Sequence, residues 1–209
     1  MQADPGETEA SLLRAAQRGS LEAFNRLVER YQRQVFNVCY RTLANVDDAA
    51  DATQEAFLGA YRGLASFRGA AEGFRPWLLR IAVNACYDQL RRRKRRPADS
   101  LEGFSAGRES DDEAGPADRL PDPAPGPEQH ALSRETARGI EAALACLSPD
   151  QRLTVVLCDV QGLSYEEAAQ VMAVELGTVK SRLSRARAHL RDLLQAAGEL
   201  PSAASRLEQ

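Results

Sequence analysis

The chain has 209 residues, enough for one moderate hydrophobic core or two small ones. Its net charge of −3 is unevenly spread. Residues 1–96 contain sixteen Lys and Arg and eleven Asp and Glu, whereas residues 97–130 contain two basic and nine acidic residues. Residues 131–209 are nearly balanced, with nine basic and ten acidic residues. The acidic total therefore does not exclude a polyanionic partner. Since no apolar run approaches the length of a membrane span, we expect a cytoplasmic protein without membrane insertion.

The cysteines give no sign of a metal site. Cys39, Cys86, Cys146 and Cys158 are scattered through apolar helical positions, and neither histidine is near a cysteine in the sequence. We expect small, reduced core residues, with no metal ligands and no cofactor. The sequence also shows no evident nucleophile–base set, so we expect no catalytic residues.

Residues 1–8 are predicted to be a flexible N-terminus, and residues 9–96 a domain of four helices. The first helix runs from about Thr8 to Gln17, and Ser20 caps a second that continues to about Leu43. The inner face of the second helix is predicted to comprise Leu21, Phe24, Leu27, Val28, Tyr31, Val35, Val38 and Cys39.

A third helix is predicted from Asp47 or Asp48 to Leu64. One side of it is acidic and exposed, which indicates either a solvated surface or a docking surface for a helical partner. The residues that share this side are Asp51, Gln54, Glu55 and Leu58.

A glycine-bearing loop at residues 66–75 leads to Pro76, which favours the start of a fourth helix. That helix ends in six consecutive cations at residues 91–96. Their mutual repulsion favours a polyanionic partner, which could be nucleic acid or a membrane surface, and they also stabilise the helix C-terminus.

The fourth helix carries further side chains before these cations. Trp77 and Ile81 are most simply explained as core residues. Asn84 and Asp88 lie one turn apart on one face, where they contact either bases or water.

Residues 97–130 contain six prolines and four glycines among 34 positions. Such a segment cannot bury enough apolar surface to offset the entropy of ordering, so it is predicted to be a flexible, acidic Pro/Gly-rich linker. Strand-type alternation is absent from the sequence. The predicted fold is all-α, with two small helical domains on either side of this linker.

Residues 131–196 are predicted to form the second domain, followed by a flexible tail at residues 197–209. Capping boxes begin two helices at Ser148 and Ser164, and Gly162 ends the first. A short turn then leads to a third helix, which completes a helix-turn-helix motif.

The last helix of this motif has five cations and no acid between Lys180 and Arg191. Its apolar stripe consists of Leu176, Val179, Leu183, Ala186 and Leu190. One flank of the stripe carries Lys180, Arg187 and Arg191, and the other carries Arg182, Arg185 and His189. Ser181 and Ser184 point away from the buried face, an arrangement that suits the DNA major groove. A merely solvated helix would more often mix charge signs.

Three blocks together resemble one family: DAADATQEAFLGAYRGLASFRG (Asp48–Gly69), FRPWLLRIAVNACYDQLRRR (Phe74–Arg93) and LSYEEAAQVMAVELGTVKSRLSRARAHLR (Leu163–Arg191). Their order and spacing are similar to those of the extracytoplasmic-function (ECF) group of bacterial RNA polymerase sigma factors. The resemblance implies a factor without catalysis of its own, which directs core RNA polymerase to promoters and is regulated by an anti-sigma factor. Ala173 and Glu175 stand where the family usually has Gly and often Pro, so a small change of geometry at the turn is expected.

The resemblance also implies contact surfaces. Core polymerase is expected to bind through the coiled coil of its largest subunit and through its flap; the residues expected at the coiled coil are Asp48, Asp51, Gln54, Glu55 and Leu58. For the −10 promoter element they are Phe67, Arg68, Trp77, Asn84, Asp88, Arg91 and Arg92. For the −35 element they are Thr178, Lys180, Ser181, Arg182, Ser184, Arg185 and Arg187.

Two other functions are weighed against this one. A free-standing regulator would use only the C-terminal motif and leave residues 47–69 and the basic helix unexplained. A nucleic-acid enzyme would need a nucleophile–base set or metal ligands.

Promoter elements about 17 base pairs apart lie roughly 58 Å from each other. A flexible 34-residue linker has an average end-to-end distance of only about 30–35 Å. Polymerase is therefore expected to act as the scaffold that holds both domains on the promoter.

Overall fold

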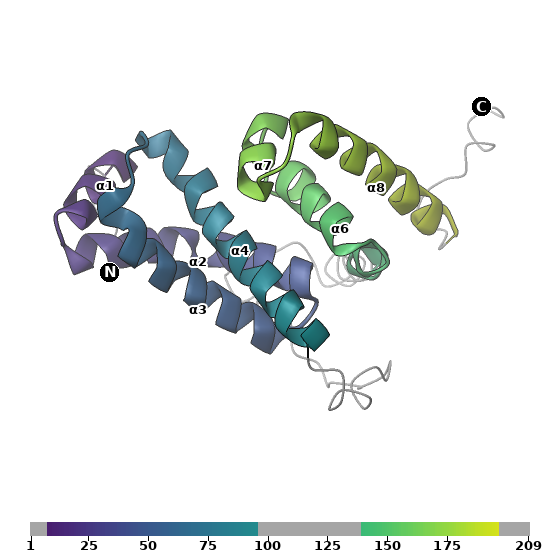
Figure 1. The fold of residues 1–209 in the computed structure, drawn as a ribbon, viewed down its shortest axis with the longest axis horizontal. Coiled ribbons are helices and arrows are strands. Elements are labelled where there is room, and N and C mark those ends of the chain that lie inside the picture. The colour runs from purple at the N-terminus through teal and green to yellow at the C-terminus, as the bar shows by residue number, and fades with distance from the viewer. Residues whose placement is uncertain (1–7, 96–138, 197–209) are drawn as a thin grey trace, which may run out of the picture.

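The computed structural model describes residues 8–95 and 139–196. Every regular element in these two ranges is helical, which confirms the all-α prediction, and the helices form the two predicted groups (Figure 1). The predicted linker at residues 97–130, the tail at residues 197–209 and nearly all of the predicted N-terminal segment lie outside the described residues. The exact domain boundaries stay predictions.

The N-terminal domain has the four expected helices: α1 (Glu9–Gln17), α2 (Leu21–Leu43), α3 (Val46–Gly63) and α4 (Phe74–Arg95). Thr8 and Ser20 cap the first two, accepting backbone N–H groups with their side chains. Two predicted starts were wrong by a short distance. Asn45 caps α3, which therefore begins before Asp47, and a 3₁₀ turn (Ala71–Gly73) continues into α4 before Pro76.

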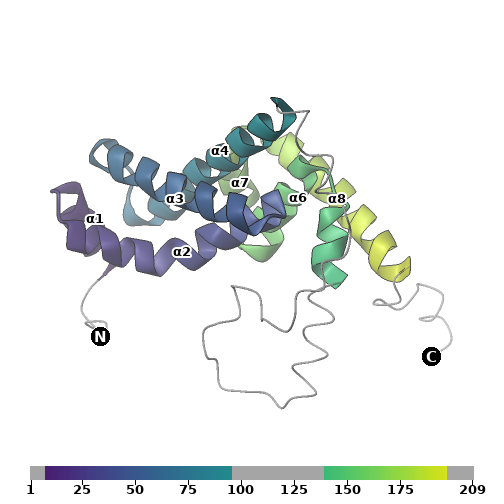
Figure 2. The same cartoon turned by 90° about the horizontal axis from the view of Figure 1, so that it is seen from below.

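Helices α2, α3 and α4 pack together, and α1 packs against α2 (Figures 1 and 2). The buried side of α3 is made only of small residues, which allow its neighbours to approach closely: Ala49, Ala52, Ala56 and Ala60. The predicted inner face of α2 was wrong at Leu21, which is 58% exposed because it lies at the first helical position, at the end of the packed face.

In the C-terminal domain, residues 139–145 are helical and are followed by α6 (Pro149–Val155), a π-helical turn η3 (Val156–Val160), α7 (Tyr165–Met172) and α8 (Leu176–Ala196). Both predicted capping boxes are formed. Gly162 has a φ of +67°, as a residue that ends a helix often does. Helix α8 packs against both α6 and α7, and α7 also contacts η3, which confirms the helix-turn-helix arrangement.

The two domains are in contact. Helix α4 lies against α7, and α2 lies against α6 and η3 (Figures 1 and 2). Polar contacts cross this boundary: Tyr87 donates to Asp150 at 2.9 Å, and Arg152 donates to the backbone oxygen of Thr42 at 3.3 Å. Arg152 also donates to backbone oxygens of its own domain, and burial lowers its pKa.

The cysteine prediction was right for three positions and wrong for one. Cys39, Cys86 and Cys158 are buried free thiols, whereas Cys146 is exposed because it lies in the turn before α6. Among residues 8–95 and 139–196, no group of side chains is suited to a metal ion, and no helix is long and apolar enough to cross a membrane.

Candidate nucleic-acid and protein interfaces

The outer face of α8 is polar and cationic. The predicted apolar stripe is buried at its centre, with Val179, Leu183 and Ala186 at most 2% exposed. Four exposed residues of α8 are here called the reading face: Ser181 and Ser184 point away from the stripe, and Lys180 and Arg185 lie on its two flanks. Thr178 is half-buried beside them.

Backbone contacts organise part of the reading face. The Ser181 hydroxyl donates to the backbone oxygen of Thr178 at 3.0 Å, and Arg185 Nε donates to that of Ser181 at 3.2 Å. Within the described part of the chain, no acidic side chain forms an ion pair with Lys180 or Arg185. Both cations therefore remain available for phosphates or for guanine acceptor atoms.

The other two predicted arginines of α8 are engaged within the protein. Arg182 pairs with Asp150 of α6 at 2.5 Å, and its side chain is only 21% exposed. Arg187 pairs with Asp159 of η3 through two hydrogen bonds. These bonds raise the pKa of Arg187 above its usual value. The sequence pattern did not show this difference among the arginines of α8.

The basic end of α4 lies beside the acidic side of α3. Arg92 pairs with Glu55 at 3.2 Å, and Arg93 pairs with Asp48. The structure thus joins residues predicted for two different surfaces, and Asp48 is only 27% exposed. These pairs, together with that of Arg91 and Asp88, offset part of the repulsion among the consecutive cations of α4.

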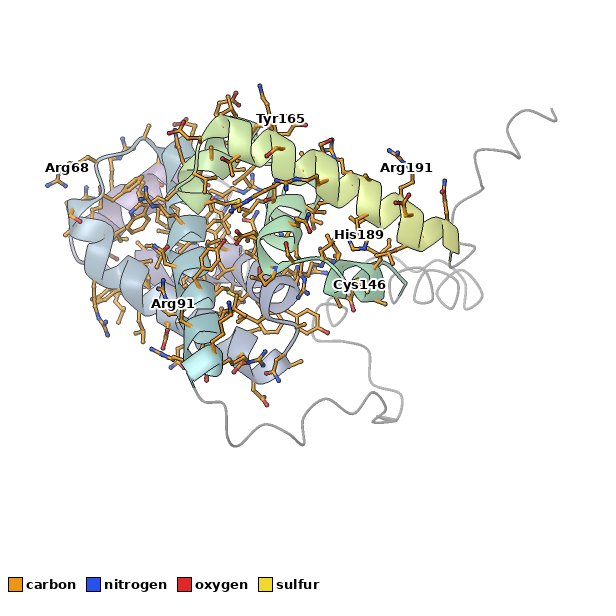
Figure 3. The ribbon with its side chains drawn as sticks, turned by 45° about the vertical axis from the view of Figure 1, so that its right-hand side comes forward. Arg68, Arg91, Cys146, Tyr165, His189 and Arg191 are labelled. Atoms are coloured by element: carbon orange, nitrogen blue, oxygen red, sulfur yellow. The ribbon has the colours of Figure 1, made fainter. Side chains whose placement is uncertain are left out.

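The rest of the predicted α4 surface is accessible to different degrees. Asn84 is exposed, whereas Asp88 is partly exposed and forms an ion pair with Arg91 one turn away. Figure 3 shows Arg68 and Arg91 projecting from the N-terminal domain, while His189 and Arg191 lie along α8 toward its C-terminal end.

The loop before α4 is closed over an aromatic cluster. Phe67 is only 8% exposed, and its ring centroid lies 5.0 Å from that of Trp77 and 6.0 Å from that of Phe74. Gln17 of α1 holds the loop by donating to the backbone oxygen of Phe67 at 2.9 Å. Trp77 is half-buried, consistent with core packing, while Arg68 is exposed.

The exposed side of α3 contains a residue that the sequence reasoning missed. Asp51, Gln54 and Glu55 are exposed as predicted, and Leu58 is 47% exposed. Tyr61, one turn beyond Leu58, is 48% exposed and extends the same face. An aromatic residue at i+3 from an exposed leucine was the signal that could have identified it.

Comparison with known proteins supports the resemblance. Sigma-70 region 2 matches residues 27–96, and Sigma-70 region 4 matches residues 137–190. These two matches coincide with the helices that carry the candidate surfaces.

Whole-chain relatives agree with these matches. The chain is 40% identical over 187 residues to the ECF RNA polymerase sigma factor SigM of Mycobacterium tuberculosis, covering 90% of this chain and 85% of that one. It is 37% identical over 177 residues to the ECF RNA polymerase sigma factor SigE of Mycolicibacterium smegmatis, covering 84% of this chain and 63% of that longer relative. The solved sigma factor RpoE from Bartonella quintana, in complex with the anti-sigma factor NepR, has a TM-score of 0.63 at 28% identity, covering 84% of this chain and 98% of that one. The chain therefore belongs to the ECF family of RNA polymerase sigma factors.

Proposed function

We propose that this sigma factor divides promoter recognition between its two domains, with the reading face of α8 on the −35 element and the outer surface of α4 on the −10 element. Core polymerase performs the chemistry and holds both domains on one promoter. The protein then acts in the cytoplasm, where polymerase and promoter DNA meet.

The reading face is the observation that carries the −35 assignment. Lys180 and Arg185, which have no ion-pair partner among residues 8–95 and 139–196, lie beside two small hydroxyl side chains on a helix whose other side is buried. A helix of this kind fits the major groove, where cations contact phosphates or guanine and hydroxyls reach other base edges. Each good base contact contributes about 1–3 kcal/mol of discrimination.

The −10 assignment is supported by the accessible surface around α4. Arg68 and Asn84 are exposed, and Arg91, although paired with Asp88, keeps 62% of its side chain exposed. Because Phe67 lies in the aromatic cluster, its contact with an unstacked base requires the loop to move. Gln17 would release the loop in such a movement.

The polymerase assignment is supported by the exposed side of α3. Leu58 and Tyr61 provide apolar surface beside Asp51 and Gln54. A central apolar patch with a polar rim is typical of a protein interface. We propose that this surface binds the coiled coil of the largest subunit. A second contact, with the flap of core polymerase, is also proposed.

Regulation by an anti-sigma factor is part of the proposal. The similar RpoE of Bartonella quintana was solved with its anti-sigma factor NepR. A partner of the same class would keep this chain away from polymerase until it is released.

Run-off transcription with purified core polymerase and a promoter library tests the function. We expect promoter-dependent transcripts only when the chain is present, and their sequences define both elements. Arg185→Gln should weaken recognition upstream, and Asn84→Ala should weaken it downstream. Transcripts that do not depend on the chain would contradict the proposal.

A further inference from the structure

The cations of α8 fall into two groups. Lys180, Arg185 and Arg191 are exposed and have no ion-pair partner within the described residues. Arg182 pairs with a carboxylate of α6, and Arg187 pairs with one of η3. The two pairs lie on opposite flanks of the buried stripe of α8.

The Arg187 pair has the geometry of a clamp. Nε donates to one carboxylate oxygen of Asp159 at 3.1 Å, and Nη2 donates to the other. Such a two-point contact fixes the orientation of the guanidinium plane as well as its position. It ties the middle of α8 to η3, outside the apolar seam.

The Arg182 pair fixes the other flank. Its partner Asp150 lies in the first turn of α6 and also accepts a hydrogen bond from Tyr87 of α4. The Arg182 side chain is more buried than that of Arg187, 21% against 48% exposed. A DNA phosphate has less access to this guanidinium than to Lys180 or Arg185.

The buried seam alone leaves the roll of α8 weakly defined. Its fully packed members, Val179, Leu183 and Ala186, are small or medium-sized and form a narrow line. Rotation about the helix axis would displace Ser184 and Arg185 from the base edges while keeping much of the seam in contact. The ion pairs on both flanks oppose this rotation. The contacts of α8 with base edges depend on such positioning.

We propose that Arg182 and Arg187 are positioning residues, which set the roll of α8 through Asp150 and Asp159, and that Lys180 and Arg185 supply the cationic DNA contacts. This inference rests on the proposed −35 recognition by α8. An arginine already paired with a carboxylate would have to exchange one anionic partner for another to bind a phosphate, so it contributes little to counterion release.

The salt dependence of DNA binding distinguishes the two roles. We would measure binding of holoenzyme, made from the full chain and core polymerase, to a labelled promoter duplex obtained from the run-off library. Each lost phosphate contact lowers the slope of log Kobs against log salt by about 0.9. We expect this loss for Lys180→Gln or Arg185→Gln if the residue contacts a phosphate, and an unchanged slope for Arg187→Gln with about two- to fivefold weaker binding at every salt concentration.

Substitution of Asp159, the partner of Arg187, changes the charge in the opposite direction and gives a second test. Asp159→Asn removes a negative charge, which would strengthen DNA binding if Arg187 served as a phosphate contact. Positioning instead predicts about two- to fivefold weaker binding, as for Arg187→Gln. The double variant Asp159→Arg with Arg187→Asp rebuilds the pair in reverse, and we expect affinity within about twofold of the wild type.

Arg14→Gln, at an exposed position on α1, is the matched control for loss of one positive charge. A drop of about 0.9 in slope for Arg187→Gln, tighter binding by Asp159→Asn, or no recovery in the reversed pair would overturn the positioning role. A wild-type holoenzyme that shows no promoter binding would instead contradict the proposed function, and the positioning role with it. The wild-type measurement therefore separates the two failures.

Discussion

The Tyr87 hydroxyl donates to one oxygen of the Asp150 carboxylate at 2.9 Å, and the other oxygen of that carboxylate accepts from Arg182. One side chain of α6 thus joins α4 of the N-terminal domain to α8 of the C-terminal domain. The helices proposed to read the two promoter elements are therefore bridged by a single carboxylate, whereas the elements lie roughly 58 Å apart. We therefore expect the domains to separate when both elements are bound.

Domain separation is the first prediction. With dyes on exposed Cys146 and on Glu22→Cys of α2, we expect energy transfer to fall when the chain joins polymerase on a promoter. Tyr87→Phe, which removes one hydrogen bond across the boundary, should lower the transfer partly in the free chain. In the free chain, Tyr61→Phe is the control, since it removes a hydroxyl from a tyrosine away from this boundary. Equal transfer in the free and promoter-bound states would contradict the prediction.

The stability of the chain should fall at alkaline pH. Burial, followed by the hydrogen bond and charge of Asp150, raises the pKa of Tyr87; burial and Glu9 do the same for Tyr31. Above about pH 10 the unfolded chain loses these protons while the folded chain keeps them, so the free energy of unfolding decreases as pH rises. Urea titrations from pH 8 to pH 11.5 should show a smaller decrease for Tyr87→Phe than for the wild type. Equal decreases would show that Tyr87 titrates alike in both states.

Local signals in the sequence were sufficient for most of the fold. The capping boxes at Ser148 and Ser164 involve residues three positions apart, and Gly162 acts on its own backbone, so these boundaries could be read directly. The buried stripe of α8 follows from helical periodicity alone.

The remaining features depend on contacts between distant segments. Arg182 and Arg185 look equivalent on a helical wheel, and only the position of Asp150 in α6 makes one of them an internal partner. Phe67 could be predicted near the −10 surface, but its burial depends on Trp77, Phe74 and the hold of Gln17 on the loop. Contact between the domains leaves no periodic signal in either of them.

The turn of the helix-turn-helix motif should gain stability from glycine. Ala173 has φ +53° and ψ +47°, in the left-handed region, which costs a residue with a Cβ roughly 1–2 kcal/mol. Glycine removes this cost but loses about 0.4–1 kcal/mol through the entropy of the unfolded chain, so Ala173→Gly should stabilise the fold by about 0.5–1 kcal/mol. Ala188→Gly, within α8, should destabilise it by about 1 kcal/mol. Chemical denaturation measures both, and a loss of stability for Ala173→Gly would contradict the expectation.

The exposed side of α3 should bind polymerase without stabilising the fold. Leu58→Glu places a charge in the centre of the proposed apolar patch, so we expect at least about tenfold weaker binding to core polymerase. Stability should change by less than about 0.5 kcal/mol, because the residue is 47% exposed. Leu21→Glu, at a leucine of α2 that is 58% exposed, is the matched control. Competition against labelled wild-type chain gives both affinities, and equal affinities would remove α3 from the proposed interface.

The closed loop before α4 should depend on glycine at position 69. A Cβ added there would lie 2.5 Å from the Phe67 ring, which is itself packed against Trp77. Because the ring must shift, Gly69→Ala should destabilise the fold by about 1–3 kcal/mol. A Cβ at Gly73 would lie 3.9 Å from the same ring, an ordinary contact, so Gly73→Ala should not disturb the ring. Trp77 is the only tryptophan, so its fluorescence during urea unfolding follows this cluster in both variants. Equal stability of the two variants would mean that Phe67 has room to move, and that the loop is held mainly by the hydrogen bond from Gln17.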